Sequence, residues 1–262
     1  MQAWLKHLVV LFPDQNLSAT EHIAFSKYFG ELDRNDPTVS LRDTTYPEII
    51  PITNRENDGK PSNTRNVGRS WHTDLAHTIC PAKASLLLCK QKPESGGDTL
   101  FANLYMAYEA LSAPMRRFID ALEAVHDTMR TTGMHDRDAA VVAQIRRDNP
   151  PVVQSLVRVH PQTGRKSLLV GQRVSHILGM TPGESEAILS YLNEHASSPE
   201  FVYRHRWSVD DLLIWDNRCT MHLALGDYDP KQIRYMVRTS IIGDVTGRML
   251  SSTQTTPMAL AG

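Results

Sequence analysis

Cysteine is scarce in this chain. Its 262 residues include three cysteines, Cys80, Cys89 and Cys219, and no two of them form a Cys-x-x-Cys pair. The low number excludes a disulfide-stapled scaffold, and the wide spacing argues against a zinc ribbon. Both features favour a reducing compartment, so we expect a cytoplasmic protein.

Long apolar runs and an excess of one charge are also missing. No apolar run approaches the roughly 20 residues of a membrane-spanning helix, and residues 1–7 lack the apolar core and cleavage site of a signal peptide. The 28 basic residues balance 29 acidic ones. We therefore expect a soluble protein that binds neither a membrane nor a nucleic acid, since a polyanionic partner selects a basic surface.

What the chain does contain is a series of short apolar segments separated by turn residues. They predict strands over residues 8–12, 48–53, 84–89, 99–101, 201–207, 211–215 and 234–242, and a hairpin over 154–170. Helices are predicted from Ser18 to Gly30, over 104–111 and 114–122, and from Thr181 to about Ala196. Many strands with few helices indicate a mainly β (α+β) fold, a β-sandwich or jelly roll, as one domain over residues 1–262.

Residues 129–151 differ from the rest of the chain. They are rich in arginine and aspartate, contain Gly133 and end in a Pro-Pro pair. We interpret the segment as a lid over the site, and the alternative is a solvated surface insertion.

The first chemical motif is the pair His72 and Asp74 within Ser70-Trp71-His72-Thr73-Asp74-Leu75. In a strand, this spacing points both side chains to one face. Two such ligands and a second histidine would make a facial triad, which leaves positions open on Fe(II). Alone the motif is weak, because 11 histidines and 29 acidic residues give about one such match by chance. A surface hydrogen-bonded pair is the alternative.

A second histidine is available at His222, which closes the stretch that begins at Trp215. Two arginines, Arg234 and Arg238, follow after a turn. On their own these residues have ordinary explanations: a partly buried core histidine, and a pair of solvated arginines or an arginine that pairs with an acid such as Asp227.

Together, the motifs resemble the taurine dioxygenase and 2,4-D dioxygenase (TauD/TfdA) family of Fe(II)/2-oxoglutarate enzymes. The resemblance covers nearly the whole chain and rests on His72-Thr73-Asp74, Gly96-Gly97-Asp98-Thr99, Trp215-Asp216-Asn217-Arg218, His222 and the Arg234/Arg238 pair. Within the family, residues 158–161 and 167–171 are similar to the aryloxyalkanoate dioxygenases. The resemblance implies a double-stranded β-helix, the cupin-like jelly roll. Family members carry a further N-terminal strand and helix, so the chain is expected to be short at its front end.

The resemblance also implies roles for particular residues. His72, Asp74 and His222 would bind Fe(II), and Thr99 and Arg234 would hold 2-oxoglutarate. Arg238, Arg173 and His176 would contact a small anionic organic substrate. The expected reaction uses O₂, releases succinate and CO₂, and hydroxylates an organic acid next to its anionic end. Hydroxylation beside an ether oxygen, as in an aryloxyalkanoate, would cleave the ether.

Several alternatives remain at this point. Within the family, a sulfonate or sulfate ester dioxygenase and an amino-acid hydroxylase share the same motifs, and the chain is compatible with a homo-oligomer. A nucleic-acid demethylase would show a basic surface. A halogenase of this superfamily lacks the carboxylate ligand, which Asp74 supplies here. A non-catalytic jelly-roll binding protein would have no need for all three metal ligands.

Overall fold

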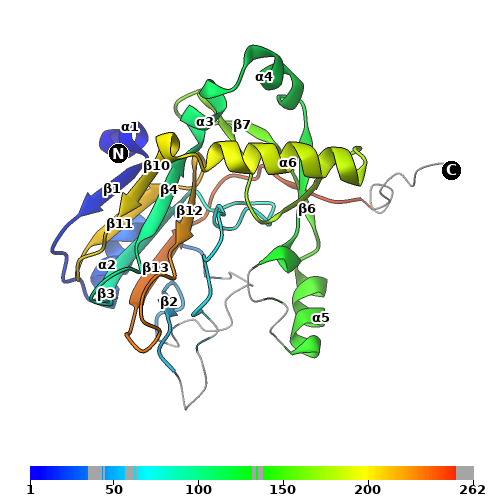
Figure 1. Ribbon diagram of the computed structural model, residues 1–262. Coiled ribbons are helices and arrows are strands. Elements are labelled where there is room, and N and C mark those ends of the chain that lie inside the picture. Colours follow the sequence, from blue (N-terminus) through cyan, green and yellow to red (C-terminus); the bar gives the residue numbers. More distant parts are fainter. Residues whose placement is uncertain are drawn as a thin grey trace.

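Two antiparallel sheets pack face to face (Figure 1). The computed structural model describes residues 1–34, 43, 45–56, 62, 64–131, 134 and 138–251. The larger sheet has the order β1-β11-β3-β13-β2 and the smaller one β10-β4-β12. Their strands are β1 (Val9–Phe12), β11 (Leu212–Asp216), β3 (Ala84–Gln91), β13 (Tyr235–Ile241), β2 (Ile50–Thr53), β10 (Val202–His205), β4 (Thr99–Asn103) and β12 (Thr220–Ala224). These bounds confirm the predicted strands to within a few residues.

The remaining strands form two smaller antiparallel sheets. A four-stranded sheet has the order β14-β6-β5-β9, and β7 pairs with β8 in a hairpin. The strands are β14 (Arg248–Met249), β6 (Val152–Ser155), β5 (Glu123–His126), β9 (Val174–Ile177), β7 (Val157–Val159) and β8 (Lys166–Leu168). The predicted hairpin over 154–170 was therefore too long. Gln154 belongs to β6 and pairs with Ala124 of β5, because the chain changes sheets at Leu156.

The helices lie outside the sheets. They are α1 (Gln2–His7), α2 (Ala19–Lys27), α3 (Leu104–Ala110), α4 (Ala113–Ile119), α5 (Ala139–Asp148), α6 (Pro182–Ala196) and two 3₁₀ turns, η1 (Thr128–Arg130) and η2 (Pro199–Phe201). Capping boxes at Ser18 with Glu21 and at Thr181 with Glu184 begin α2 and α6. Within the described ranges, no helix combines the length and apolar character needed to cross a membrane.

The two main sheets enclose an apolar core that forms the floor of the candidate site. Leu87 and Trp215 from the larger sheet meet Phe101 from the smaller one, and Met236 of β13 joins them. All four side chains are buried. Full burial of a large apolar side chain stabilises a fold by about 1.5–3 kcal/mol, so this cluster rigidly fixes the strands that carry the site.

Residues 129–151 are described in part, and Gly133 lies outside the described residues. Helix α5 packs Val142 and Ile145 against Met129 and Met134, in a small apolar cluster of its own. Figure 1 shows α5 standing apart from the two main sheets.

Candidate metal and substrate site

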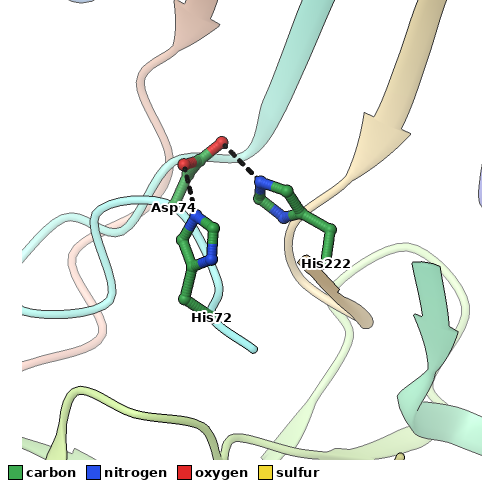
Figure 2. Close-up of side chains that lie close together, drawn as sticks. All are labelled: His72, Asp74 and His222. Carbon is green, nitrogen blue, oxygen red and sulfur yellow. Dashed lines mark ion pairs between the residues drawn. The ribbon is translucent and has the colours of Figure 1, made fainter. Parts of the chain in front are cut away.

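His72, Asp74 and His222 converge on one point (Figure 2). Their ligand atoms all lie within 4.8 Å of one another. His72 Nε2 is 3.6 Å from Asp74 Oδ1, and His222 Nε2 is 3.9 Å from Asp74 Oδ2. The three residues are only 3–6% exposed, so they are not a surface hydrogen-bonded pair with a distant histidine.

The backbone brings the three side chains together through a bridge followed by a turn, and not through a continuous strand. His72 pairs with His222 through two backbone hydrogen bonds of 3.1 and 2.8 Å, as an isolated bridge. The chain then turns at Asp74, and Leu75 has a φ of 53°. The same-face geometry that a strand would give therefore does not apply at Asp74. The turn, and not the alternation of a strand, brings the carboxylate to the two imidazoles.

The charge states of the three residues suit a divalent metal. His72 Nδ1 lies 2.8 Å from the Ser70 carbonyl oxygen; since a carbonyl only accepts, Nδ1 carries the proton and Nε2 faces the centre. Burial, together with the nearby His72, holds the pKa of His222 well below its usual range. Burial alone would raise the pKa of Asp74, but the Arg238 guanidinium and the two imidazoles hold it well below its usual range. Two imidazoles and one carboxylate are the donor set of a facial-triad iron site.

A glycine lets the neighbouring loop approach the imidazoles closely. Gly68 has a φ of +79°, and a Cβ there would lie 3.3 Å from His72 Cε1. On the other side, the Trp215 ring lies 4.8 Å from the His222 ring, centroid to centroid. The His222 imidazole is therefore held against an aromatic wall, and the His72 imidazole against backbone.

Arg234 and Thr99 form a second polar group next to the triad. Arg234 Nε donates to the Gly97 carbonyl over 2.9 Å, and Nη2 lies 3.4 Å from Thr99 Oγ1. Burial lowers the pKa of Arg234 to about 10, so the guanidinium remains charged at neutral pH. Among the described residues, Arg234 makes no ion pair with a carboxylate. A buried cation of this kind is a natural site for an anionic ligand.

Arg238 contacts a carboxylate other than the one considered from the sequence. Its Nη1 lies 2.9 Å from Asp74 Oδ1, whereas Asp227 accepts from Arg204 Nη2 over 3.1 Å. The acid that Arg238 is seen to pair with is therefore Asp74. Arg234 and Arg238 both line a cavity of about 30 Å³ that also borders His72, His222 and Thr99.

The other two predicted substrate residues lie farther out. Arg173 hydrogen-bonds His77, which lies in the turn that follows Asp74. His176 is part of β9, and its Nδ1 is 2.9 Å from Ser175 Oγ. Neither residue lines the cavity that the triad borders.

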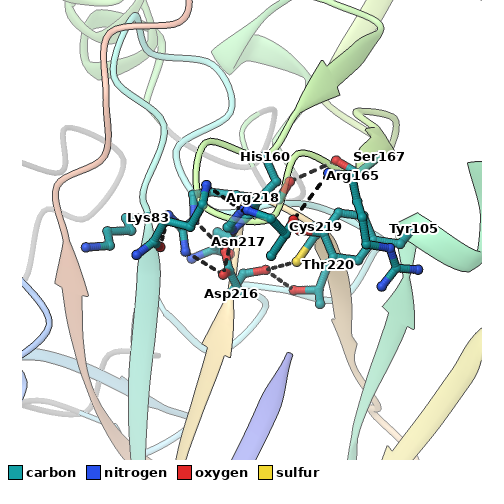
Figure 3. Close-up of polar contacts among 12 residues, drawn as sticks. Lys83, Tyr105, His160, Arg165, Ser167, Asp216, Asn217, Arg218, Cys219 and Thr220 are labelled. Carbon is teal, nitrogen blue, oxygen red and sulfur yellow. Dashed lines mark hydrogen bonds and ion pairs between the residues drawn. The ribbon is translucent and has the colours of Figure 1, made fainter. Parts of the chain in front are cut away.

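The turn before β12 carries a buried polar network that residue types alone did not reveal (Figure 3). Arg218 holds Asp216 with two hydrogen bonds, of 2.8 Å from Nε and 2.7 Å from Nη2. Ser167 Oγ donates to the Arg218 carbonyl over 2.9 Å, and Arg158 Nη2 donates to the Asn217 carbonyl over 2.5 Å. The β7–β8 hairpin thus clamps the turn from which β12 carries His222 into the site.

A second group of residues lies close enough to share a metal ion: His160, Asp216 and Cys219. Other interactions within the protein, however, already involve these side chains. His160 Nδ1 accepts two backbone N–H groups at 3.2 Å, so Nε2 carries the proton and donates to Asp216. Arg218 neutralises Asp216, and burial raises the pKa of the Cys219 thiol. This cluster is a structural clamp and not a metal site.

The order and geometry of these residues match one known family. The model of the family described as "Taurine catabolism dioxygenase TauD, TfdA family" matches residues 1–240. The chain belongs to this family. It is an α-ketoglutarate (2-oxoglutarate)-dependent dioxygenase, and O₂ and 2-oxoglutarate are its cosubstrates.

Two relatives illustrate the range of the family. The dioxygenase is 36% identical to the alpha-ketoglutarate-dependent 2,4-dichlorophenoxyacetate dioxygenase of Cupriavidus pinatubonensis, over 90% of this chain and 85% of the relative. It is 34% identical to the alpha-ketoglutarate-dependent sulfate ester dioxygenase of Pseudomonas putida, over 93% of this chain and 79% of the relative.

A solved structure shows the same fold. The crystal structure of AAD-2 in complex with Mn(II) and N-oxalylglycine superposes with a TM-score of 0.80 at 32% identity, over 94% of this chain and 88% of that one. The predicted jelly roll is thereby confirmed, and AAD-2 binds a metal in this fold.

Proposed function

We propose that His72, Asp74 and His222 hold Fe(II). The observation that carries this proposal is the buried convergence of three ligand atoms within 4.8 Å, in charge states that leave lone pairs on each. When bound, Fe(II) with 2-oxoglutarate and O₂ supplies the oxidation of a C–H bond, with release of succinate and CO₂. The protein's own residues then have to bind, orient and shield the reactants.

Arg234 and Thr99 would hold the distal carboxylate of 2-oxoglutarate. Thr99 Oγ1 accepts from Trp207 Nε1 over 3.0 Å and lies 3.4 Å from Arg234 Nη2. Because both neighbours are donors only, the hydroxyl proton of Thr99 is left to donate to a third group. A carboxylate would receive that proton and the remaining N–H groups of the guanidinium, which can bind it bidentately.

Arg238 would hold the anionic end of the primary substrate. Its guanidinium touches a proposed metal ligand, so an anion bound to it would place its neighbouring carbon beside the metal. A small carboxylic acid of the aryloxyalkanoate type fits this arrangement, with ether cleavage after hydroxylation, and the 36% identity to the Cupriavidus enzyme supports it. The similarity to the Pseudomonas enzyme favours a sulfate ester as the second candidate.

Residues 129–151 would close over this substrate as a lid within a single domain of residues 1–262. The segment starts next to the site, because Arg130 Nε donates to the Gln172 carbonyl over 2.9 Å. The Gln172 N–H in turn donates to the Trp71 carbonyl, one residue before His72. Arg173 and His176 would contact the substrate beneath this lid, and the reaction would take place in the cytoplasm.

A screen for substrate-stimulated succinate release tests the proposal. The panel contains aryloxyalkanoates, alkyl sulfonates, alkyl sulfate esters and amino acids, each with Fe(II), 2-oxoglutarate and O₂. We expect the strongest stimulation from an aryloxyalkanoate, with release of the phenol. Stimulation by sulfate esters alone would support the second candidate. A protein that forms no succinate from 2-oxoglutarate with or without any compound would contradict the proposed site.

A further inference from the structure

Ser85 places a hydroxyl group in a largely buried, leucine-rich strand. It belongs to β3, has no exposed surface and precedes the run Leu86, Leu87, Leu88. Burying a hydroxyl destabilises a protein unless the group is hydrogen-bonded. Ser85 makes two such bonds: Oγ donates to Asp74 Oδ2 over 2.6 Å and accepts from Asn217 Nδ2 over 2.9 Å.

The direction of these bonds follows from the chemistry of the groups. Trp215 Nε1 can only donate, and it lies 3.0 Å from Asn217 Oδ1. The backbone N–H of Asp74, also a donor only, lies 3.4 Å from the same oxygen. The amide of Asn217 therefore turns its NH₂ group to Ser85. Ser85 accepts that proton, and its own hydroxyl proton is left for the Asp74 carboxylate.

We propose that Ser85 is a positioning residue for the metal, with Asn217 holding Ser85 in place. The inference rests on the proposed role of Asp74 as a metal ligand. Asp74 sits in a turn, where the backbone alone does not fix the plane of its carboxylate. A 2.6 Å bond from a hydroxyl on a buried strand fixes that plane. Partners of this kind around a metal ligand typically change metal affinity by about 10- to 100-fold.

The chain offers a matched control in Ser240. It lies directly opposite Ser85 in the register of β13 and β3 and is 1% exposed. Among the residues that the structure describes, its Oγ has no hydrogen-bond partner. Ser240→Ala therefore removes a buried hydroxyl from the same region of the sheet without touching Asp74.

The experiment is an anaerobic titration of the metal-free protein with Co(II), followed by visible absorption. We compare the wild type with Ser85→Ala, Ser85→Thr and Ser240→Ala, and record the thermal unfolding midpoint of each metal-free protein. Ser85→Ala should weaken Co(II) binding by about 10- to 100-fold. Ser240→Ala should bind as the wild type does, and Ser85→Thr, which keeps the hydroxyl, should recover most of the affinity.

The outcomes separate the inference from the proposed function. Equal Co(II) affinity in Ser85→Ala and Ser240→Ala would overturn the positioning role and leave the metal site intact. If Ser85→Ala loses both affinity and stability, recovery of affinity in Ser85→Thr supports the role and its absence overturns it. A wild-type protein that binds no Co(II) would overturn the metal site itself, and the inference with it.

Discussion

Arg238 Nη1 lies 2.9 Å from Asp74 Oδ1, and both residues are at most 4% exposed. The cation proposed for the substrate thus touches the carboxylate proposed for the metal. The contact also explains why Asp74 stays ionised in a buried position. One ion pair therefore joins the residue proposed to bind the substrate, Arg238, to a residue proposed to bind the metal, Asp74.

Replacing Arg238 by methionine tests its role on the substrate. The variant keeps the apolar stem and loses the charge-assisted bond, which is worth roughly 1.5–3 kcal/mol. We expect the KM of the primary substrate to rise about ten- to a hundredfold, with the 2-oxoglutarate titration near wild type. Arg204→Met, which removes an exposed arginine that pairs with Asp98 and Asp227, is the control. An equal rise in both constants would assign Arg238 a structural role on Asp74.

Replacing Arg234 by alanine tests the cosubstrate site. The change removes the guanidinium next to Thr99 and leaves the triad untouched. The 2-oxoglutarate concentration needed for half-maximal succinate formation should rise about ten- to a hundredfold, while Co(II) affinity stays near wild type. If the 2-oxoglutarate titration of the variant matched that of the wild type, Arg234 would not be the residue that binds 2-oxoglutarate.

We expect the buried ion pair between Arg218 and Asp216 to raise the free energy of unfolding. Asp216→Ala leaves the Arg218 guanidinium without its buried partner, and breaking such a pair costs about 3–5 kcal/mol. Arg165→Ala breaks an exposed pair with Glu109, for which about 0–1 kcal/mol is expected. Urea unfolding of the two variants measures the difference. Equal losses in free energy of unfolding would show that the clamp does not hold the turn.

Buried histidines should make the fold sensitive to acid. Burial, with the charge of Lys90, lowers the pKa of His22 to about 4, and burial, with the charges of Arg158 and Arg173, lowers that of His126 to about 3. Below about pH 6.5 these two histidines bind protons in the unfolded chain, whereas in the folded chain they remain neutral. The free energy of unfolding should therefore fall with pH from 6.5 to 4, by about 1.4 kcal/mol per unit for each histidine.

A single substitution checks this slope. Urea unfolding between pH 7 and 4.5 should show a shallower loss in His22→Gln, by about one histidine's contribution. Identical slopes in the wild type and His22→Gln would rule out this histidine as a source of the acid sensitivity.

Much of the fold follows from local signals in the sequence. The capping boxes at Ser18 and Thr181 predict where α2 and α6 begin, because a side-chain oxygen and a glutamate three residues later satisfy the first N–H groups. The apolar runs predict β3 and β11 for a similarly local reason. Register and sheet membership depend on distant pairing, so the separation of Gln154 from the β7–β8 hairpin was not predictable.

The part of the site that could be predicted from the sequence is the part that recognisable motifs supply. The convergence of His72, Asp74 and His222 could be expected from motif order, although the turn at Asp74 could not. Ser85 was missed because its residue type and its neighbours in β3 do not show which distant groups it bonds. The role proposed for Ser85 depends on its hydrogen bond with Asn217, which lies 132 positions away in the chain.

The most direct test of the account is succinate formation by His222→Ala, assayed with saturating Fe(II), 2-oxoglutarate and the best substrate from the screen. His195→Ala, which removes a histidine of α6 that bonds the Ala107 carbonyl, is the matched control. Loss of a metal ligand should reduce succinate formation by more than about a hundredfold, with a thermal unfolding midpoint of the metal-free protein near that of His195→Ala. Substantial turnover in a folded His222→Ala protein would contradict the assignment of His72, Asp74 and His222 as the metal site.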